Sequence, residues 1–220
     1  MATFALITEG ITDQIALDAI LAGHYQSDDI FIRELQPLRD ETDKARQNSS
    51  GGWEQVLEYC RHTNNITDAL QFSDFIIIQF DTDCIEHKNF DVKLTTSGVE
   101  KPEEQLIEEV KARIIKEIDA DCFEKNKEKI FFAISIHSLE CWIIPLHEKN
   151  SQKATQTKKC EDRLRYIHNQ NKPQEKYSKT AGVYKKITKK FEKKDHISSA
   201  CEASISFNYF IKSLPAIAEE

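Results

Sequence analysis

Four runs of apolar residues in the first part of the chain predict short strands. They cover residues 4–10, 29–35, 74–83 and 129–136. The third run contains FIIIQF, which is hydrophobic at nearly every position, as is typical of a central parallel strand with both faces buried. The second run alternates apolar and polar side chains and therefore predicts a strand nearer the edge of the sheet.

Helical patterns separate these strands. Residues 12–23 place apolar side chains on one helical face after Thr12, a residue suited to an N-cap. Further helices are predicted from Trp53, after Pro102 and, as a short element, after Ser138. Because strands and helices alternate, the pattern predicts an α/β fold, a mostly parallel sheet with helices on both faces.

The C-terminal third of the chain has a different pattern, which is helical only. We therefore expect an α/β catalytic core over residues 1–146 and a lysine-rich helical appendage, packed on that core, over residues 147–220. The polar segment 36–52 shows no periodicity and predicts a long loop, a common position for functional residues.

The composition is typical of a soluble globular protein, with 40% hydrophobic and 30% charged residues among 220. No apolar stretch is long enough to span a bilayer, so no membrane partner is expected, and the first residues lack the basic start of a signal peptide. The six cysteines include no CxxC pair, so neither a zinc cluster nor a disulfide framework is expected. These features favour a cytoplasmic location.

Charge is distributed unevenly along the chain, although its net value is only −7. Residues 1–146 hold 14 Lys and Arg against 28 Asp and Glu, whereas residues 147–194 hold 15 against 5. An acidic body with a basic face is compatible with binding to nucleic acid, because lysines attract phosphates. It is equally compatible with docking on an acidic protein, or with a solvated helical face.

Acidic residues follow two of the predicted strands. Glu9 ends the first strand, and Asp81 and Asp83 end the third. The carboxyl ends of parallel strands meet at one edge of a sheet, and positions 81 and 83 point the same way. If the two strands are neighbours, three carboxylates meet there, and a Mg²⁺ or Mn²⁺ ion would relieve their repulsion. Ordinary turn acids are the alternative interpretation.

Other acids are close to this edge in the predicted fold. Glu140 follows the last strand and is a candidate for catalysis at a two-metal site, or simply a favourable acid in the first turn of a helix. Glu86 is a further possibility. Asp13 is interpreted as an acid that interacts with the dipole of the first helix and not as a metal ligand.

Five residues are candidates for contacts with a substrate. Gly51 and Gly52 stand directly before a helix, where free amides bind anions and glycine lets a phosphate approach the backbone. Arg39 lies in the same loop, and Gly10 follows the first acid. His137 is a candidate general acid or base. A flexible loop, and a histidine that only forms a hydrogen bond at a strand end, are the simpler alternatives.

The order of the acids limits the choice of family. Haloacid-dehalogenase phosphatases and receiver domains both carry an acidic pair at the first strand, whereas here the single acid comes first. The segments LITEGITDQIALDAIL, IIIQFDTD and SIHSLECWIIPLH, in this order, resemble the Toprim domain over roughly residues 4–144. The last segment is similar to a helix of small standalone Toprim proteins of the RloB-like kind, relatives of the overcoming-lysogenization-defect nucleases.

The resemblance implies a Mg²⁺-dependent (or Mn²⁺-dependent) nuclease in which Glu9, Asp81 and Asp83 ligate the metal and Glu140 assists. It also implies a role in anti-phage defence, with DNA or RNA (tRNA included) as substrate and a regulatory ATPase as partner. A homo-oligomer is compatible with the sequence. One alternative is a non-catalytic subunit that binds a partner and keeps a vestigial metal site. A phosphatase of small phosphoesters is another.

Overall fold

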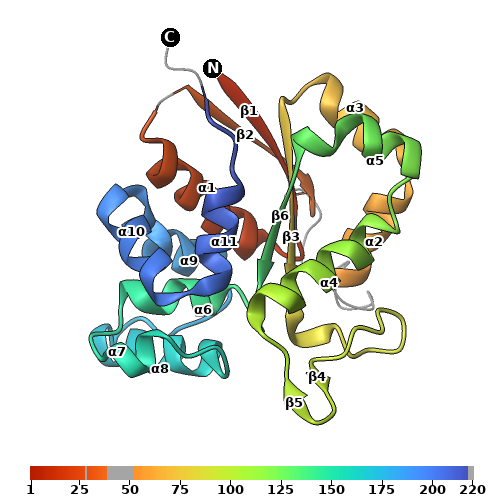
Figure 1. The fold of residues 1–220 in the computed structure, drawn as a ribbon. Helices are drawn as coiled ribbons and strands as arrows, with labels where there is room; N and C mark the ends of the chain where they lie inside the picture. The colour runs from red at the N-terminus through yellow and green to blue at the C-terminus, as the bar shows by residue number, and fades with distance from the viewer. Residues whose placement is uncertain (28, 39–51, 218–220) are drawn as a thin grey trace.

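The computed structural model describes residues 1–27, 29–38 and 52–217, and it confirms the predicted α/β fold (Figure 1). Four parallel strands form the main sheet, in the order β2-β1-β3-β6. They are β1 (Ala2–Ile7), β2 (Ile30–Gln36), β3 (Phe75–Asp81) and β6 (Ile130–Ser135). The apolar third run is thus a central strand, and the alternating second run lies at an edge, as their patterns predict.

The first and third predicted strands are direct neighbours, which is the condition for their acids to meet. Phe4 of β1 lies opposite Phe75 of β3, and Ile7 lies opposite Ile78. On the other side of β3, Asp81 lies opposite Ser135 of β6. All four strands therefore end at the same edge, which we call the carboxyl edge.

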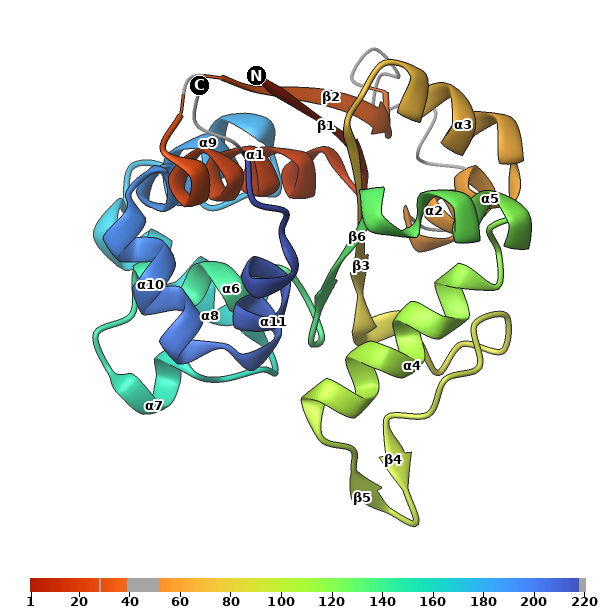
Figure 2. The same cartoon turned by 45° about the horizontal axis from the view of Figure 1, so that its top comes forward.

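Helices cover both faces of the sheet (Figures 1 and 2). One face carries α1 (Ile11–Tyr25), α9 (Ala181–Thr188), α10 (Lys194–Ala203) and α11 (Ile205–Ser213). The other face carries α2 (Gly52–Arg61), α3 (Thr63–Gln71), α4 (Glu103–Ile115) and α5 (Ala120–Asn126). The remaining elements are α6 (Glu140–Ile143), α7 (Ser151–Ala154), α8 (Cys160–Asn171), the hairpin β4 (Thr95–Thr96) and β5 (Val99–Glu100), and the 3₁₀ turns η2 (Thr82–Cys84), η3 (Lys127–Lys129), η4 (Ile144–Leu146) and η5 (Lys189–Glu192).

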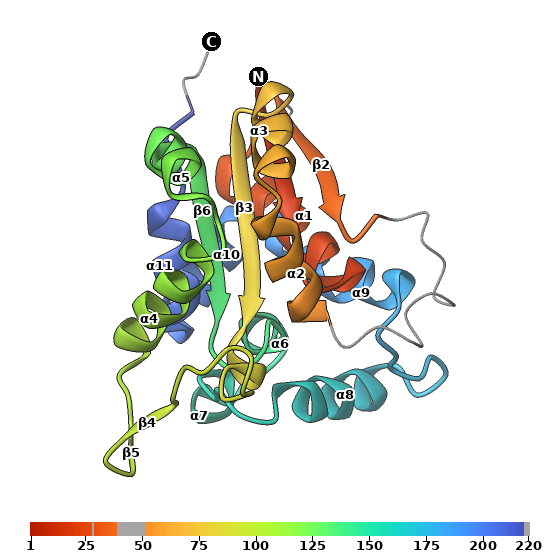
Figure 3. The same ribbon diagram turned by 90° about the vertical axis from the view of Figure 1, so that its right-hand side faces the viewer.

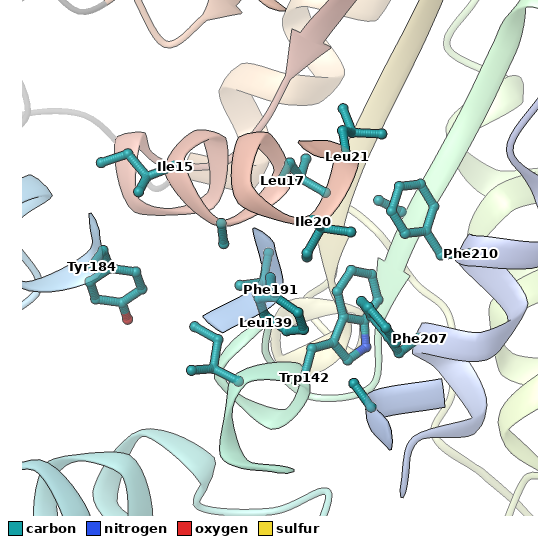
Figure 4. Packing of buried hydrophobic residues seen from close by; sticks show 14 of the residues in the cluster. Ile15, Leu17, Ile20, Leu21, Leu139, Trp142, Tyr184, Phe191, Phe207 and Phe210 are labelled. Atoms are coloured by element: carbon teal, nitrogen blue, oxygen red, sulfur yellow. The ribbon is translucent and has the colours of Figure 1, made fainter. Parts of the chain in front are cut away.

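A single apolar cluster joins the start of the chain to its C-terminal helices. Trp142 of α6 stacks on Phe210 of α11 with ring centroids 5.6 Å apart, and its Nε1 donates to Ser206 Oγ at 2.9 Å. Phe207 and Phe191 pack in the same cluster below α1 (Figure 4). Burial of these rings helps to hold α11 and η5 against α1 and the sheet.

Some local features differ from the sequence prediction. The helix predicted from Trp53 is followed at once by a second one, α3, and both α5 and the β4–β5 hairpin were not expected. Cys141 and Cys160 form a disulfide with Cα atoms 5.0 Å apart. The expectation of no disulfide was therefore wrong for this pair, because the fold brings α6 and α8 together across 19 residues of sequence. No helix among the described residues is long and apolar enough to cross a membrane.

Candidate active site at the carboxyl edge

Glu9 and Asp81 meet at the carboxyl edge, as the sequence predicts. Glu9 lies just beyond β1, and its Oε1 accepts a hydrogen bond from the backbone N–H of Asp81, the last residue of β3, at 2.7 Å. Asp83 follows in η2, and its backbone N–H donates to the carbonyl of His137 at 3.1 Å. The two acidic motifs, more than 70 residues apart in sequence, are thus joined by a direct hydrogen bond.

A buried glutamine links the two strands beneath these acids. Gln79 Oε1 accepts from the backbone N–H of Glu9 at 3.1 Å, and its Nε2 donates to Asp81 Oδ1 at 2.8 Å. Its side chain is fully buried. Gln79 was not among the residues predicted for the site, although a lone polar residue inside an apolar strand is a signal that could have identified it.

The Asp81 carboxylate is oriented by three donors and repelled by its neighbours. Besides Gln79, its Oδ1 accepts from the Ser135 hydroxyl and from the backbone N–H of Leu139, the latter at 3.1 Å. Burial raises the pKa of Asp81 well above its usual value, and the charges of Glu9 and Asp13 raise it further. The hydrogen bonds thus fix one oxygen of a carboxylate whose ionisation is unfavourable in the protein alone.

Crowding of negative charge also affects the neighbouring acids. Burial is the main reason that the pKa of Glu9 rises to about 8, and the charges of Asp13 and Asp83 contribute to the rise. The hydrogen bond from the backbone N–H of Asp81 acts in the opposite direction. Burial likewise raises the pKa of Asp83, with Lys179 opposing and Glu140 adding to it. Asp13, interpreted above as a helix-dipole acid, lies in the first turn of α1 and acts electrostatically on Glu9. It is therefore a member of the acid cluster that the sequence interpretation missed.

Glu140 is engaged differently from the other acids. Its carboxylate is 2% exposed, accepts a hydrogen bond from the Tyr184 hydroxyl, and pairs with Lys179 Nζ at 2.9 Å. Burial acts to raise the pKa of Glu140, but Lys179, Tyr184 and Ser138 together lower it below its usual value. Glu140 is therefore an ionised acid whose charge is already compensated by the protein.

Lys179 brings positive charge into the acid cluster from the C-terminal segment. Its ammonium lies between Glu140 and Glu161, at 2.9 and 3.3 Å, and its charge also acts on Glu9 and Asp83. The side chain is 48% exposed, so it remains accessible. In the sequence Lys179 is one of many lysines of the C-terminal segment, and nothing local indicates that it reaches the acids.

The two described glycines among the predicted substrate contacts lie against the acids. A Cβ at Gly10 would lie 3.1 Å from Asp13 Oδ2, and a Cβ at Gly52 would lie 2.5 Å from the Glu9 carbonyl oxygen. The first residue of α2 therefore packs directly on the backbone of Glu9. Arg39 and Gly51, the other predicted contacts of that loop, lie outside the described residues.

His137 lies beside Asp83 at the end of β6. Its backbone has a φ of 60°, and its N–H donates to Thr82 Oγ1 at 2.7 Å. Burial and the ammonium of Lys158 lower the pKa of His137. Its imidazole is therefore neutral at pH 7 and able to accept a proton.

The chemistry of this cluster fits a divalent cation, although the side chains do not form a ready cage. Glu9, Asp81 and Asp83 offer hard oxygen ligands whose raised pKa values reflect poorly compensated charge. Among the described residues, no three His, Cys, Asp or Glu side chains are arranged so that they could hold a metal ion. Mg²⁺, however, commonly takes only one or two carboxylates, with water and substrate phosphate completing its shell.

Comparisons of this chain with family models, curated proteins and solved structures found no match.

Proposed function

We propose that this protein is a Toprim-type, Mg²⁺-dependent nuclease (Mn²⁺ being the alternative metal) that hydrolyses phosphodiester bonds in nucleic acid. The observation that carries the proposal is the contact between Glu9 and Asp81, with Asp83 and Asp13 close enough to raise the pKa values further. Carboxylates crowded in this way at the carboxyl ends of parallel strands are suited to hold a metal against a phosphate.

Of Glu9, Asp81 and Asp83, one or two would ligate the metal directly in this proposal, and water and the substrate phosphate would complete its shell. When bound, the metal supplies positive charge to the scissile phosphate and activates water. Gln79 and Ser135 keep Asp81 oriented through hydrogen bonds to Oδ1, so the carboxylate needs no reorganisation during the reaction.

Three other side chains have roles that do not depend on metal ligation. Lys179 reduces the repulsion between the acid cluster and an approaching phosphate, because its accessible ammonium lies among the carboxylates. Glu140, proposed from the sequence as a catalytic acid, acts here by holding Lys179 in place. His137 can take a proton from the attacking water, since its ring is neutral at pH 7.

A non-catalytic subunit with a vestigial metal site is the second candidate function. The observation in its favour is that the described residues offer no three-ligand group for a metal. A role in anti-phage defence and regulation by an ATPase rest on the sequence resemblance alone, and a cytoplasmic location rests on the sequence features described above; all three remain predictions.

The test is a cleavage panel of plasmid, single-stranded DNA, total RNA and tRNA with Mg²⁺ or Mn²⁺. Wild type is compared with Glu9→Gln and with Glu128→Gln, which removes an exposed carboxylate next to the amino end of β6. We expect Glu9→Gln to lower the rate about 100-fold or more, and Glu128→Gln to cut like wild type. Equal cutting by all three would overturn the proposal. Turnover of small phosphoesters alone would indicate a phosphatase.

A further inference from the structure

The outer face of α8 carries an exposed aromatic ring. Tyr166 is 56% exposed, and the guanidinium of Arg163, which is paired with Glu148, lies 5.1 Å from its ring centroid. The inner face of the helix is buried through Cys160, Leu164 and Ile167. Tyr166 therefore lies on the solvent side of a helix that is fixed to the protein along its other side.

Lysines mark both ends of this helix. Lys159 precedes its first residue and Lys172 follows its last, and both are exposed. Twelve residues separate them, which corresponds to about 18 Å of helix. The acids of α8 are paired with basic side chains: Asp162 and Glu161 share Arg165, and Glu161 also contacts Lys179.

The chain after α8 folds back along the helix toward the acid cluster. Near the carboxyl end of α8, the Tyr177 N–H donates to Asn169 Oδ1 at 2.9 Å. Two residues later, Lys179 contacts Glu161 in the first turn of α8. Exposed Lys176 lies between these two anchored positions in the sequence. Positive charge thus continues from the far end of α8 to the candidate active site.

Helix α8 lies at the carboxyl edge of the sheet, which is the edge that holds the acid cluster. In Figure 3, α8 lies beyond the arrowheads of β3 and β6, on the side of the carboxyl edge. Its amino end is tied to the site, because Cys160 is bonded to Cys141, the residue after Glu140. A polyanion on α8 would therefore lead directly to the acid cluster.

We propose that α8 binds single-stranded nucleic acid across its outer face and its two ends, with a base stacked on Tyr166 and phosphates on Lys159, Lys172 and Lys176. This surface would deliver the substrate to the proposed nuclease site, so its role in the protein rests on the proposed function. Bases stack on exposed aromatic rings only where they are unpaired, and lysines attract the backbone without regard to sequence. An exposed tyrosine among lysines fits a single strand, in which each phosphate is joined to a base that can stack, better than an acidic segment of a protein, whose carboxylate side chains cannot stack.

The experiment measures binding in EDTA, so that it is independent of cleavage. Labelled 12-nucleotide single strands of DNA and RNA, the DNA duplex and poly-glutamate are titrated by fluorescence anisotropy over a series of salt concentrations. One variant is Tyr166→Ala, and a second combines Lys159→Gln, Lys172→Gln and Lys176→Gln. The controls are Phe72→Ala, an exposed ring after α3, and a triple glutamine variant of three exposed lysines toward the amino ends of the strands: Lys116, Lys125 and Lys129.

We expect Tyr166→Ala to weaken single-strand binding about tenfold, and the lysine variant to reduce the salt slope by about 2. Both controls should bind like wild type. Equal loss of binding in the two triple variants, or tighter binding of duplex or poly-glutamate than of single strands, would overturn the proposal. Binding that depends on α8 without any cleavage by the protein would sustain this surface and count only against the nuclease function.

Discussion

At the scale of single residues, the site depends on polar side chains whose partners come from other strands. Gln79 is the clearest case, because it serves the Glu9 backbone and the Asp81 carboxylate at once. A leucine there would suit the apolar strand but would satisfy neither partner. The residue is therefore best understood through the hydrogen bonds that it makes and not through the pattern around it.

Replacing Gln79 with leucine should destabilise the protein despite the gain in hydrophobicity. The buried N–H of Glu9 loses its acceptor, which costs about 1–3 kcal/mol in the free energy of unfolding. Urea denaturation measures the change, with Gln71→Leu on the exposed side of α3 as the control. An unchanged or higher free energy for Gln79→Leu would show that the hydrogen bonds contribute little.

The stability of the metal-free protein should fall as pH rises from about 5 to 8. The pKa of Glu9 is about 8 in the folded state and 4.5 for the ordinary group, so in this window the folded state binds more protons than the unfolded state. Stability therefore decreases with pH, and Glu9→Gln should flatten the dependence. Thermal melts between these pH values, with EDTA, measure it. A wild-type stability that rises over the window in parallel with the variant would contradict the assignment.

Sequence alone could place Glu9, Asp81 and Asp83 at one edge because strand ends are visible in the hydrophobic pattern. It could not place Lys179, since that contact depends on how the chain folds back after α8. For the same reason Glu140 could be predicted near the site, but not its pairing with Tyr184. Side chains that meet across long loops leave no local signal.

At the scale of elements, the start of α2 is fitted against the loop after β1. Gly52→Ala would push a Cβ to within 2.5 Å of the Glu9 carbonyl oxygen, so the helix or the loop must move. We expect a lower melting temperature and a loss of nuclease activity. Gly182→Ala in α9 is the matched control, because nothing lies within 4 Å of its Cβ, and it should be neutral or slightly stabilising. Equal behaviour of the two variants would argue against the close contact.

The elements themselves were predictable to the extent that their patterns were regular. The long apolar stripe of α4 and the four strands were expected, whereas the two-residue strands β4 and β5 are too short to give any period. The disulfide escaped prediction because Cys141 and Cys160 lie in two different helices, with no motif spacing. A local sequence pattern does not reveal elements or bonds that depend on tertiary contacts.

At the scale of the whole molecule, the C-terminal helices share one core with the sheet. Phe207→Ala removes a fully buried ring that contacts Trp142 and Phe191, and should cost about 3–5 kcal/mol in the free energy of unfolding. Ile205→Ala, two residues earlier and 49% exposed, should cost far less. Chemical denaturation followed by tryptophan fluorescence measures both. A small effect of Phe207→Ala would mean that the C-terminal helices are not integral to the core.

The charge asymmetry of the chain also belongs to this scale. The sequence predicts an acidic body with a basic segment, which is compatible with nucleic acid, a protein partner or solvent at that segment. In the structure the segment supplies Lys179 to the acid cluster and places Lys159 and Lys172 at the two ends of α8. This arrangement of charge depends on how the C-terminal segment folds against the carboxyl edge, which the sequence pattern does not reveal.

The most direct measurement compares activity and stability in a single variant, Asp81→Asn. The amide keeps an oxygen for Ser135 and Leu139 while it removes a buried charge that the acid cluster repels. If the cluster is a catalytic metal site, cleavage with Mg²⁺ is lost while the melting temperature in EDTA rises. Retained cleavage would contradict the account, because Asp81 would then be only an acid at the end of a strand.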